Sequence, residues 1–160
     1  QEFGQWNEWS EKRALDWYLL EDDSHRALQE FTKKCLHLNK EYPCLYATDY
    51  SSEGFRWINV NDKDNSVFSF MRISPDGKKN LLFVLNFTPV ERKKYRVGVP
   101  FKTTYKLVLG DDEDNQKKSI RTAKGDSDGY PQSILVDLNK YGICVYEFNG
   151  DVSKVQPTKL

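Results

Sequence analysis

Apolar residues recur at helical spacing in the first third of the chain. Successive members of this series are three or four positions apart, and the series consists of Leu28, Phe31, Cys35, Leu38 and Tyr42. This spacing places the side chains on one face of an α-helix. Asp22 precedes the series and can cap the first turn, whereas Pro43 follows it and cannot continue a helix. The pattern predicts an amphipathic helix over Ser24–Glu41.

The segment before this helix has no regular period. Residues 1–21 contain several large aromatic side chains, namely Trp6, Trp9, Trp17 and Tyr18. Their spacing fits neither the period of two of a strand nor the period of 3.6 of a helix. We therefore expect an ordered loop with one helical turn at most, forming part of a larger structure.

After Pro43 the pattern changes to short runs of β-branched and aromatic residues, separated by Gly, Asn, Asp and Pro. Such runs are typical of an all-β sandwich. The predicted strands are Gly54–Val60, Ser66–Ile73, Asn80–Phe87, Lys94–Val99, Thr104–Leu109, Ser119–Thr122, Gln132–Leu138 and Gly142–Phe148. The predicted fold is thus mainly β, with about eight antiparallel strands behind a loop and one helix.

Individual segments refine this prediction. The continuous apolar run Leu81–Leu85 suits a central strand covered on both faces, and Ser74–Gly77 suits the tight turn of a hairpin. Residues 151–160 contain few apolar side chains, so we expect a flexible tail. The sequence assigns several strand aromatics to the core, namely Phe55, Trp57, Phe68, Phe70 and Phe83.

Charge and composition exclude some partners. Lys and Arg number 24 and Asp and Glu also number 24, so the chain lacks the basic field of a nucleic-acid binder. No apolar run reaches the roughly 20 residues that span a bilayer, and no secretory leader is recognisable. We expect a cytoplasmic protein with neither nucleic acid nor membrane as a partner. The cysteines form no metal-type pair and are expected to be small buried residues.

Candidate catalytic groups are sparse. His25 and His37 lie twelve residues apart without a partner spacing typical of a zinc site or a triad, so both are expected at the surface. The acidic clusters lack the spacing of a calcium loop and are expected to be solvated turns. Paired carboxylates for glycoside chemistry cannot be assigned. The residues alone therefore predict a helix and a β-sandwich of unknown function.

Several short motifs carry more information through their order along the chain. They are Gln1–Gln5, Glu8–Trp9, Leu15–Glu21, Tyr42–Pro43, Gly54–Trp57, Asn86–Val90 and Tyr95–Val99. In sequence and order these motifs resemble the C-terminal portion of bacterial 1,4-α-glucan (glycogen) branching enzymes of the α-amylase superfamily. The resemblance extends over residues 1 to about 148.

This resemblance implies a division of the chain. Residues 1–43 would be the end of a catalytic (β/α)₈ barrel, with its loop and last helix, and residues 44–150 the C-terminal β-sandwich. Such enzymes cleave an α-1,4 bond and transfer the glucan segment to a 6-hydroxyl, with a carboxylate nucleophile and a carboxylic acid. The resemblance places these carboxylates upstream, so we expect an inactive fragment and a reaction without metal or organic cofactor.

The resemblance also suggests where substrate binds. Active sites of such barrels lie at the C-terminal ends of the strands. This would place Glu2, Gln5, Trp6 and Trp9 near the cleft for α-glucan, the expected substrate of the full enzyme. The alternative is that these side chains only hold their loop together.

Two roles remain open for the rest of the chain. The sandwich either supports the catalytic barrel packed against it or is an accessory module whose aromatic side chains stack on sugars. Solvent exposure separates these roles, because stacking requires an exposed row of aromatic faces. A further alternative is the C-terminal domain of a related amylase-type or debranching hydrolase.

Overall fold

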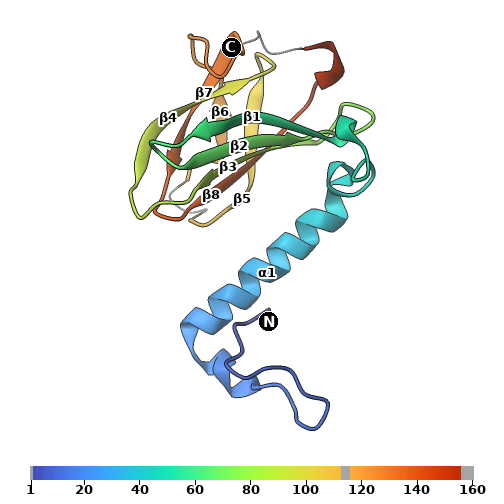
Figure 1. Cartoon of the computed structure of the whole chain (residues 1–160), viewed down its shortest axis with the longest axis vertical. Helices are drawn as coiled ribbons and strands as arrows, with labels where there is room; N and C mark the ends of the chain where they lie inside the picture. Colours follow the sequence, from blue (N-terminus) through green and yellow to red (C-terminus); the bar gives the residue numbers. More distant parts are fainter. Residues whose placement is uncertain (1, 113–115, 156–160) are drawn as a thin grey trace. The chain divides into compact units, whose positions relative to one another are not determined.

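The computed structural model describes residues 2–112 and 116–155. The chain divides into two compact units, Gln1–Glu41 and Tyr42–Leu160, which are called here the N-terminal unit and the C-terminal unit (Figure 1).

The N-terminal unit consists of a loop, a short 3₁₀-helix and one long helix. The 3₁₀-helix spans Trp17–Glu21 and α1 spans Asp23–Glu41. Asp22 begins α1, because its Oδ1 accepts a hydrogen bond from the backbone N–H of Ser24 at 2.8 Å. This bond satisfies one of the free N–H groups of the first turn. Both the predicted helix and the single helical turn before it are confirmed.

The C-terminal unit is built from antiparallel strands. The described residues form β1 Phe55–Asp62, β2 Val67–Arg72, β3 Asn80–Asn86, β4 Arg92–Val99, β5 Thr104–Gly110, β6 Ser119–Arg121, β7 Gln132–Leu138 and β8 Ile143–Phe148. One sheet has the order β1-β2-β3-β8-β5-β6, and a second sheet consists of β4 and β7 (Figure 1). Short 3₁₀-helices span Pro43–Leu45, Ser52–Gly54 and Val152–Lys154. The predicted mainly β fold is confirmed.

Strand β3 lies inside the larger sheet, between β2 and β8. Leu81, Leu82 and Val84 are completely buried, as the apolar run predicts. The predicted hairpin turn joins β2 to β3. Gly77 adopts a φ of +69° in this turn, and its N–H donates to the carbonyl of Ser74 at 3.1 Å. A left-handed φ favours glycine, which explains the residue at this place.

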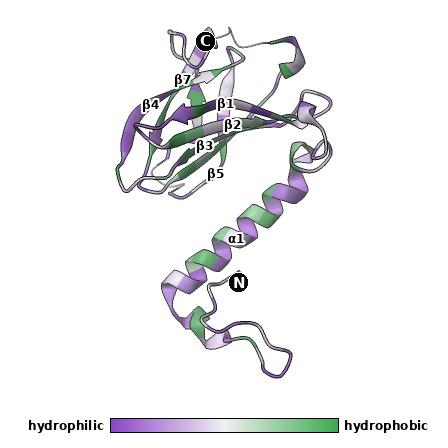
Figure 2. Ribbon diagram, viewed as in Figure 1, coloured by the Kyte–Doolittle hydropathy of each residue, from purple (hydrophilic) through white to green (hydrophobic). Residues whose placement is uncertain are grey.

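The core of the C-terminal unit combines side chains from both sheets. In β2, Val67, Ser69 and Met71 are buried and alternate with half-buried residues, as expected for successive strand side chains. The largest fully buried side chains are Tyr105, Tyr130, Tyr146, Phe148 and Met71. Figure 2 shows hydrophobic stretches in strands such as β3 and β5, whereas β4 is largely hydrophilic and α1 alternates between hydrophobic and hydrophilic patches. Burial of this apolar surface is the main stabilising term.

The assignment of the strand aromatics to the core is wrong. None of Phe55, Trp57, Phe68, Phe70 and Phe83 is buried. Phe68 and Phe70 alternate with the buried residues of β2, so they point to the opposite face of the larger sheet. Trp57 remains 47% exposed. We call this face of the larger sheet the outer face.

The expectation of a flexible tail also needs correction for residues 151–155. Val152 is 1% exposed and belongs to the core, and Val155 packs against it. Arg56 Nη1 donates to the carbonyl oxygens of Val152 at 3.1 Å and Val155 at 2.6 Å. Two valines and one arginine thus secure this segment despite its low apolar content. Residues 156–160 lie outside the described residues.

Candidate functional site

The loop before α1 is anchored by Phe3. This side chain is 5% exposed and stacks on Trp17, with ring centroids 5.3 Å apart and planes inclined by 22°. The neighbouring carbonyl of Glu2 accepts a hydrogen bond from Thr32 Oγ1 of α1 at 3.1 Å. An aromatic contact and a hydrogen bond thus attach the start of the loop to the helical part of the unit.

Gly4 allows the loop to approach the helix closely. Its φ is +70°, and a Cβ atom here would lie 3.1 Å from Leu28 Cδ2 and 3.4 Å from His25 Nδ1. Both the backbone conformation and the close contact disfavour a side chain. The glycine of the Gln1–Gln5 motif therefore has a structural explanation.

The side chain of Gln5 is half-buried and bonds within the loop. Its Oε1 accepts the backbone N–H of Asp16 at 2.9 Å, and its Nε2 donates to the carbonyl of Asn7 at 2.8 Å. Asn7 Nδ2 in turn donates to Asp16 Oδ2 at 2.8 Å. The two bonds to Asp16 join residues eleven and nine positions apart, so Gln5 helps to fix the loop conformation.

Trp6 and Trp9 present large apolar surfaces to solvent, since they are 76% and 71% exposed. Trp6 is nevertheless held in place, because its Nε1 donates to His25 Nε2 at 3.2 Å. Trp9 lines a cavity of about 180 Å³ together with Phe3, Gln5 and Leu15. Large exposed apolar side chains of this kind are candidates for a contact surface.

The four residues that the sequence places near the glucan cleft differ in their exposure and bonding. Glu2, Trp6 and Trp9 are exposed, whereas the amide of Gln5 bonds within the loop. His25 was expected at the surface, but it is half-buried and both of its ring nitrogens have partners. Sequence reasoning missed this histidine because its partners, Phe3 and Trp6, are about 20 residues away along the chain. His37 is exposed, as expected.

The two buried cysteines are not candidates for nucleophilic chemistry, whereas Cys35 is only half-buried, contrary to the expectation of burial. Cys44 and Cys144 are completely buried. Burial raises the pKa of Cys44 to about 11 and that of Cys144 to about 12, so both remain protonated near neutral pH. In residues 2–112 and 116–155 there is no group of three or more His, Cys, Asp or Glu side chains that could hold a metal ion. No helix in this part of the chain is long and apolar enough to cross a membrane.

A second aromatic surface lies on the outer face of the larger sheet. Phe83 stacks on Phe70 at 4.8 Å with nearly parallel rings. Phe70 contacts Trp57 at 5.7 Å and Phe55 at 5.2 Å. The row crosses β3, β2 and β1, and we call it the aromatic row.

A shallow depression of about 450 Å³ adjoins one end of this row. Trp57, Asn61, Asp62 and Asp128 are among its lining residues. Burial tends to raise the pKa of Asp62, but hydrogen bonds from Tyr95 and Asn65 prevail and lower it. The depression therefore combines an exposed indole with ionised and amide side chains.

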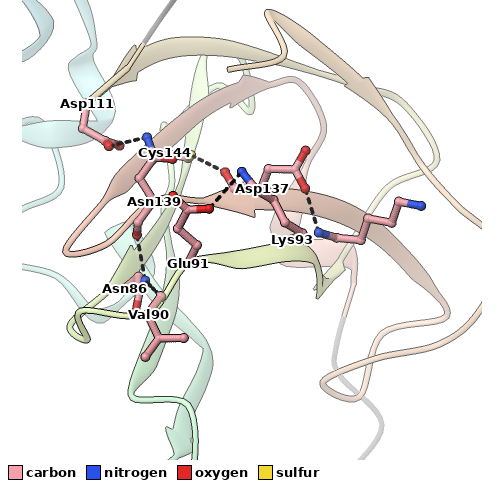
Figure 3. A network of polar contacts seen from close by, with 9 residues as sticks. Asn86, Val90, Glu91, Lys93, Asp111, Asp137, Asn139 and Cys144 are labelled. Atoms are coloured by element: carbon pink, nitrogen blue, oxygen red, sulfur yellow. Dashed lines mark hydrogen bonds and ion pairs between the residues drawn. The ribbon is translucent and has the colours of Figure 1, made fainter. Parts of the chain in front are cut away.

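The Asn86–Val90 motif forms a polar corner at the end of β3. Asn86 Nδ2 donates to the carbonyls of Val90 at 2.8 Å and Asn139 at 2.7 Å, and its Oδ1 accepts from both N and Oγ1 of Thr88. Asn139 Nδ2 continues the network by donating to Asp111 Oδ2 (Figure 3). Buried polar groups require such partners, so Asn86 and Thr88 serve the fold.

Comparisons with known proteins agree with this architecture. The chain is 44% identical over 161 residues to 1,4-alpha-glucan branching enzyme GlgB of Butyrivibrio fibrisolvens, covering 96% of this chain and 25% of that protein. It is also 44% identical over 113 residues to GlgB of Pseudomonas fluorescens (strain Pf0-1), covering 71% of this chain and 15% of that protein. The chain thus spans a quarter or less of the length of these relatives.

A crystal structure of a mutant of the trehalulose synthase MutB in complex with Tris shares the fold. Its TM-score is 0.51 at 17% identity, and the match covers 81% of this chain and 20% of that one. The model of the alpha amylase C-terminal all-beta domain matches residues 57–149, more than half of the chain. This chain therefore belongs to the family of alpha amylase C-terminal all-beta domains.

Proposed function

We propose that this chain is the C-terminal portion of a cytoplasmic 1,4-alpha-glucan branching enzyme of glycogen biosynthesis. The observation that carries this proposal is the 44% identity to GlgB of Butyrivibrio fibrisolvens over 96% of the chain. In this proposal residues 1–43 complete the catalytic barrel and residues 44–150 form the accessory sandwich. The whole enzyme cleaves α-1,4 bonds of a glucan and transfers the released segment to a 6-hydroxyl.

The chain itself supplies no catalytic group in this proposal. Retaining transfer requires a carboxylate nucleophile and a general acid about 5 Å apart, and these belong to the rest of the barrel. The contribution of this chain is to hold substrate and to support the barrel. The reaction proceeds without a metal or organic cofactor.

The N-terminal loop is the proposed glucan contact. Trp6 and Trp9 offer exposed indole faces, and an aromatic ring combines a broad apolar face with a polar edge. Such a face suits the C–H surface of a glucose ring. Glu2 is exposed and available for sugar hydroxyls, whereas Gln5 acts by fixing the loop that carries the two indoles.

The sandwich is the proposed support of the barrel. Its own core is complete, as side chains such as Leu82 and Val84 are fully buried. The aromatic row on the outer face offers an additional apolar surface for packing. A contiguous, partly exposed apolar surface of this kind favours an interface between domains.

A second candidate function is glucan binding by the sandwich. It is favoured by Trp57, which is 47% exposed beside a depression that Asn61 and Asp128 also line. The two roles differ in what Trp57 touches in the whole enzyme. If the barrel covers Trp57, the sandwich is a support; if Trp57 remains open, it is free to stack on sugar.

The branching activity is tested with the full-length enzyme that contains this chain. Purified enzyme is incubated with amylose, and α-1,6 linkages are counted by proton NMR together with the loss of iodine colour. New α-1,6 linkages without a matching rise in reducing ends support the proposal. Reducing ends without new branches would instead identify an amylase-type hydrolase.

The glucan contact is tested in the same enzyme with Trp6→Ala and Trp9→Ala. Removing a stacked indole is expected to raise KM for amylose by roughly tenfold, the equivalent of about 1.4 kcal/mol. Tyr50→Ala is the control, because it removes a fully exposed aromatic ring that belongs to neither proposed contact, and its KM should stay unchanged. An unchanged KM in both loop variants would overturn the assignment of the loop.

A further inference from the structure

His25 contacts the N-terminal loop at two points, the backbone of Phe3 and the side chain of Trp6. Its Nδ1 lies 2.7 Å from the backbone carbonyl oxygen of Phe3, and its Nε2 lies 3.2 Å from Trp6 Nε1. The imidazole and indole rings also stack, with centroids 6.2 Å apart and planes inclined by 30°. One side chain of α1 thus holds both the buried anchor and the most exposed tryptophan of the loop.

The two partners permit a single protonation state of the ring. An indole N–H is a donor only, so His25 Nε2 has to accept. A carbonyl oxygen is an acceptor only, so Nδ1 has to carry the proton. Both bonds therefore exist together only in the neutral Nδ1–H tautomer. A second proton would occupy Nε2 and abolish the bond from Trp6.

We propose that His25 is a positioning residue, which fixes the Trp6 indole for glucan while neutral and releases it when protonated. Imidazole is the side chain whose charge changes between pH 5 and 8. The orientation of Trp6 is thus sensitive to pH, and its affinity for glucan falls on acidification. The statement about glucan rests on the proposed function, whereas the statement about Trp6 does not.

The groups around His25 do not change their charge between pH 8 and pH 5, so a change of the Trp6 indole with pH is attributable to the imidazole. The loop residues against the ring are Phe3, Gly4 and Trp6, which carry no charge. On the helix side the interacting carboxylate is Asp22. Hydrogen bonds from the side chain and backbone of Ser24 lower the pKa of Asp22 below 3.8, so it remains ionised throughout the range from pH 8 to pH 5.

The first experiment uses the whole chain without ligand. Long-range proton–nitrogen correlation of the imidazoles reports the tautomer of His25 at pH 8, and the indole resonance of Trp6, assigned with Trp6→Phe, is followed to pH 5. We expect the Nδ1–H tautomer and an indole shift with the midpoint of His25. An Nε2–H tautomer, or an indole that stays fixed while His25 titrates, would overturn the proposal.

A pair of variants separates this histidine from general effects of pH. His25→Gln removes the titrating ring, so the Trp6 indole should lose most of its shift between pH 8 and pH 5. His37→Gln is the matched control, since His37 is exposed on the same helix and the shift should persist. Loss of the shift in the control instead would refute the role of His25. If His25→Gln unfolds the loop, the tautomer of His25 in the unaltered chain still tests the proposal.

The second experiment adds maltoheptaose at both pH values. Loss of one hydrogen bond that orients the indole should weaken binding at Trp6 by roughly fivefold at pH 5, and this change should vanish in His25→Gln. Equal binding at both pH values with a fixed indole would overturn the positioning role and leave the proposed function intact. A pH-sensitive indole without maltoheptaose binding would contradict the proposed glucan contact and leave the positioning role intact.

Discussion

The two units of the chain use aromatic residues in opposite ways. In the C-terminal unit Tyr105, Tyr146 and Phe148 are at most 1% exposed and form the centre of a core. In the N-terminal unit Trp6 and Trp9 remain more than 70% exposed. Among the described residues of that unit, the buried apolar side chains are Phe3, Leu19 and Leu38. Aromatic content alone therefore does not distinguish a core from a contact surface.

The difference follows from size and from the way each unit is held together. A chain of about 40 residues buries too little surface for a large core, so the N-terminal unit relies in addition on individual polar bonds such as those of Gln5 and His25. The sandwich has two sheets that cover each other. We conclude that stability resides mainly in the sandwich and that the exposed indoles of the loop remain available for binding.

The largest effect is expected from Phe148→Ala. This side chain is 1% exposed and packs against Tyr105 at a centroid distance of 5.3 Å. The cavity should lower the free energy of unfolding by about 3–5 kcal/mol, measured by urea denaturation with circular dichroism. Tyr50→Ala is the control at a fully exposed site and should change this quantity by less than about 0.5 kcal/mol. A similar loss in both variants would contradict the view that buried aromatic rings, and not exposed ones, stabilise this unit.

Asn86→Asp should have the next largest effect. The substitution keeps the size of the side chain, but it places a carboxylate oxygen against the carbonyls of Val90 and Asn139. Loss of two donated hydrogen bonds and the new repulsion should cost about 2–4 kcal/mol, measured as a shift in the urea midpoint. Asn149→Asp is the matched control, because Asn149 Oδ1 only accepts, from Lys79 N. Its midpoint should stay nearly constant, and an equal shift would contradict the explanation.

Gly4→Ala is expected to destabilise the N-terminal unit alone. A side chain at a φ of +70° and 3.1 Å from Leu28 Cδ2 should destabilise the loop by about 1–2 kcal/mol. Amide hydrogen exchange is the measurement, because it reports each unit separately. Exchange should accelerate for loop and α1 amides, whereas those of β3 and β8 serve as the internal control. Uniform acceleration in both units would show that they unfold together.

Tyr95→Phe should have the smallest effect and should depend on pH. The Tyr95 hydroxyl donates to Asp62 and helps to lower the pKa of that carboxyl. A carboxyl with a lowered pKa stabilises the folded state above its ordinary pKa and loses this contribution as the pH falls through the lowered value. The variant should therefore lose about 1 kcal/mol at pH 7 and less near pH 3. A constant loss across this range, measured by urea denaturation, would argue against the charged partner.

Much of the fold follows from local patterns. The runs around Leu81–Leu85 and Gln132–Leu138 predict strands because apolar runs between turn residues have few alternatives, and the structure contains both. The alternation of apolar and polar residues did not reveal which face of β2 is buried, since Val67 and Met71 on one face and Phe68 and Phe70 on the other are all apolar. A strand with two apolar faces does not reveal which face meets the second sheet. That information lies in contacts between distant strands.

The candidate site was predictable only in part. The exposure of Trp6 and Trp9 agrees with a surface role, but the interior role of Gln5 depends on Asp16, eleven residues away. The bonds of His25 depend on Phe3, 22 residues away. Neither partnership leaves a spacing signal, because a loop can return to a helix at any separation. Only the three-dimensional structure brings these groups together.

The most direct test of the account is a maltoheptaose titration of the 160-residue chain, followed by the indole resonances in a proton–nitrogen correlation spectrum. The account predicts saturable shifts of Trp6 and Trp9, while Trp57 and the amides of the sandwich core stay constant. Shifts of Trp57 alone would transfer glucan binding to the sandwich. A well-dispersed spectrum without any indole shift up to about 10 mM, a free energy of roughly −3 kcal/mol, would contradict the assignment of the loop as a glucan contact.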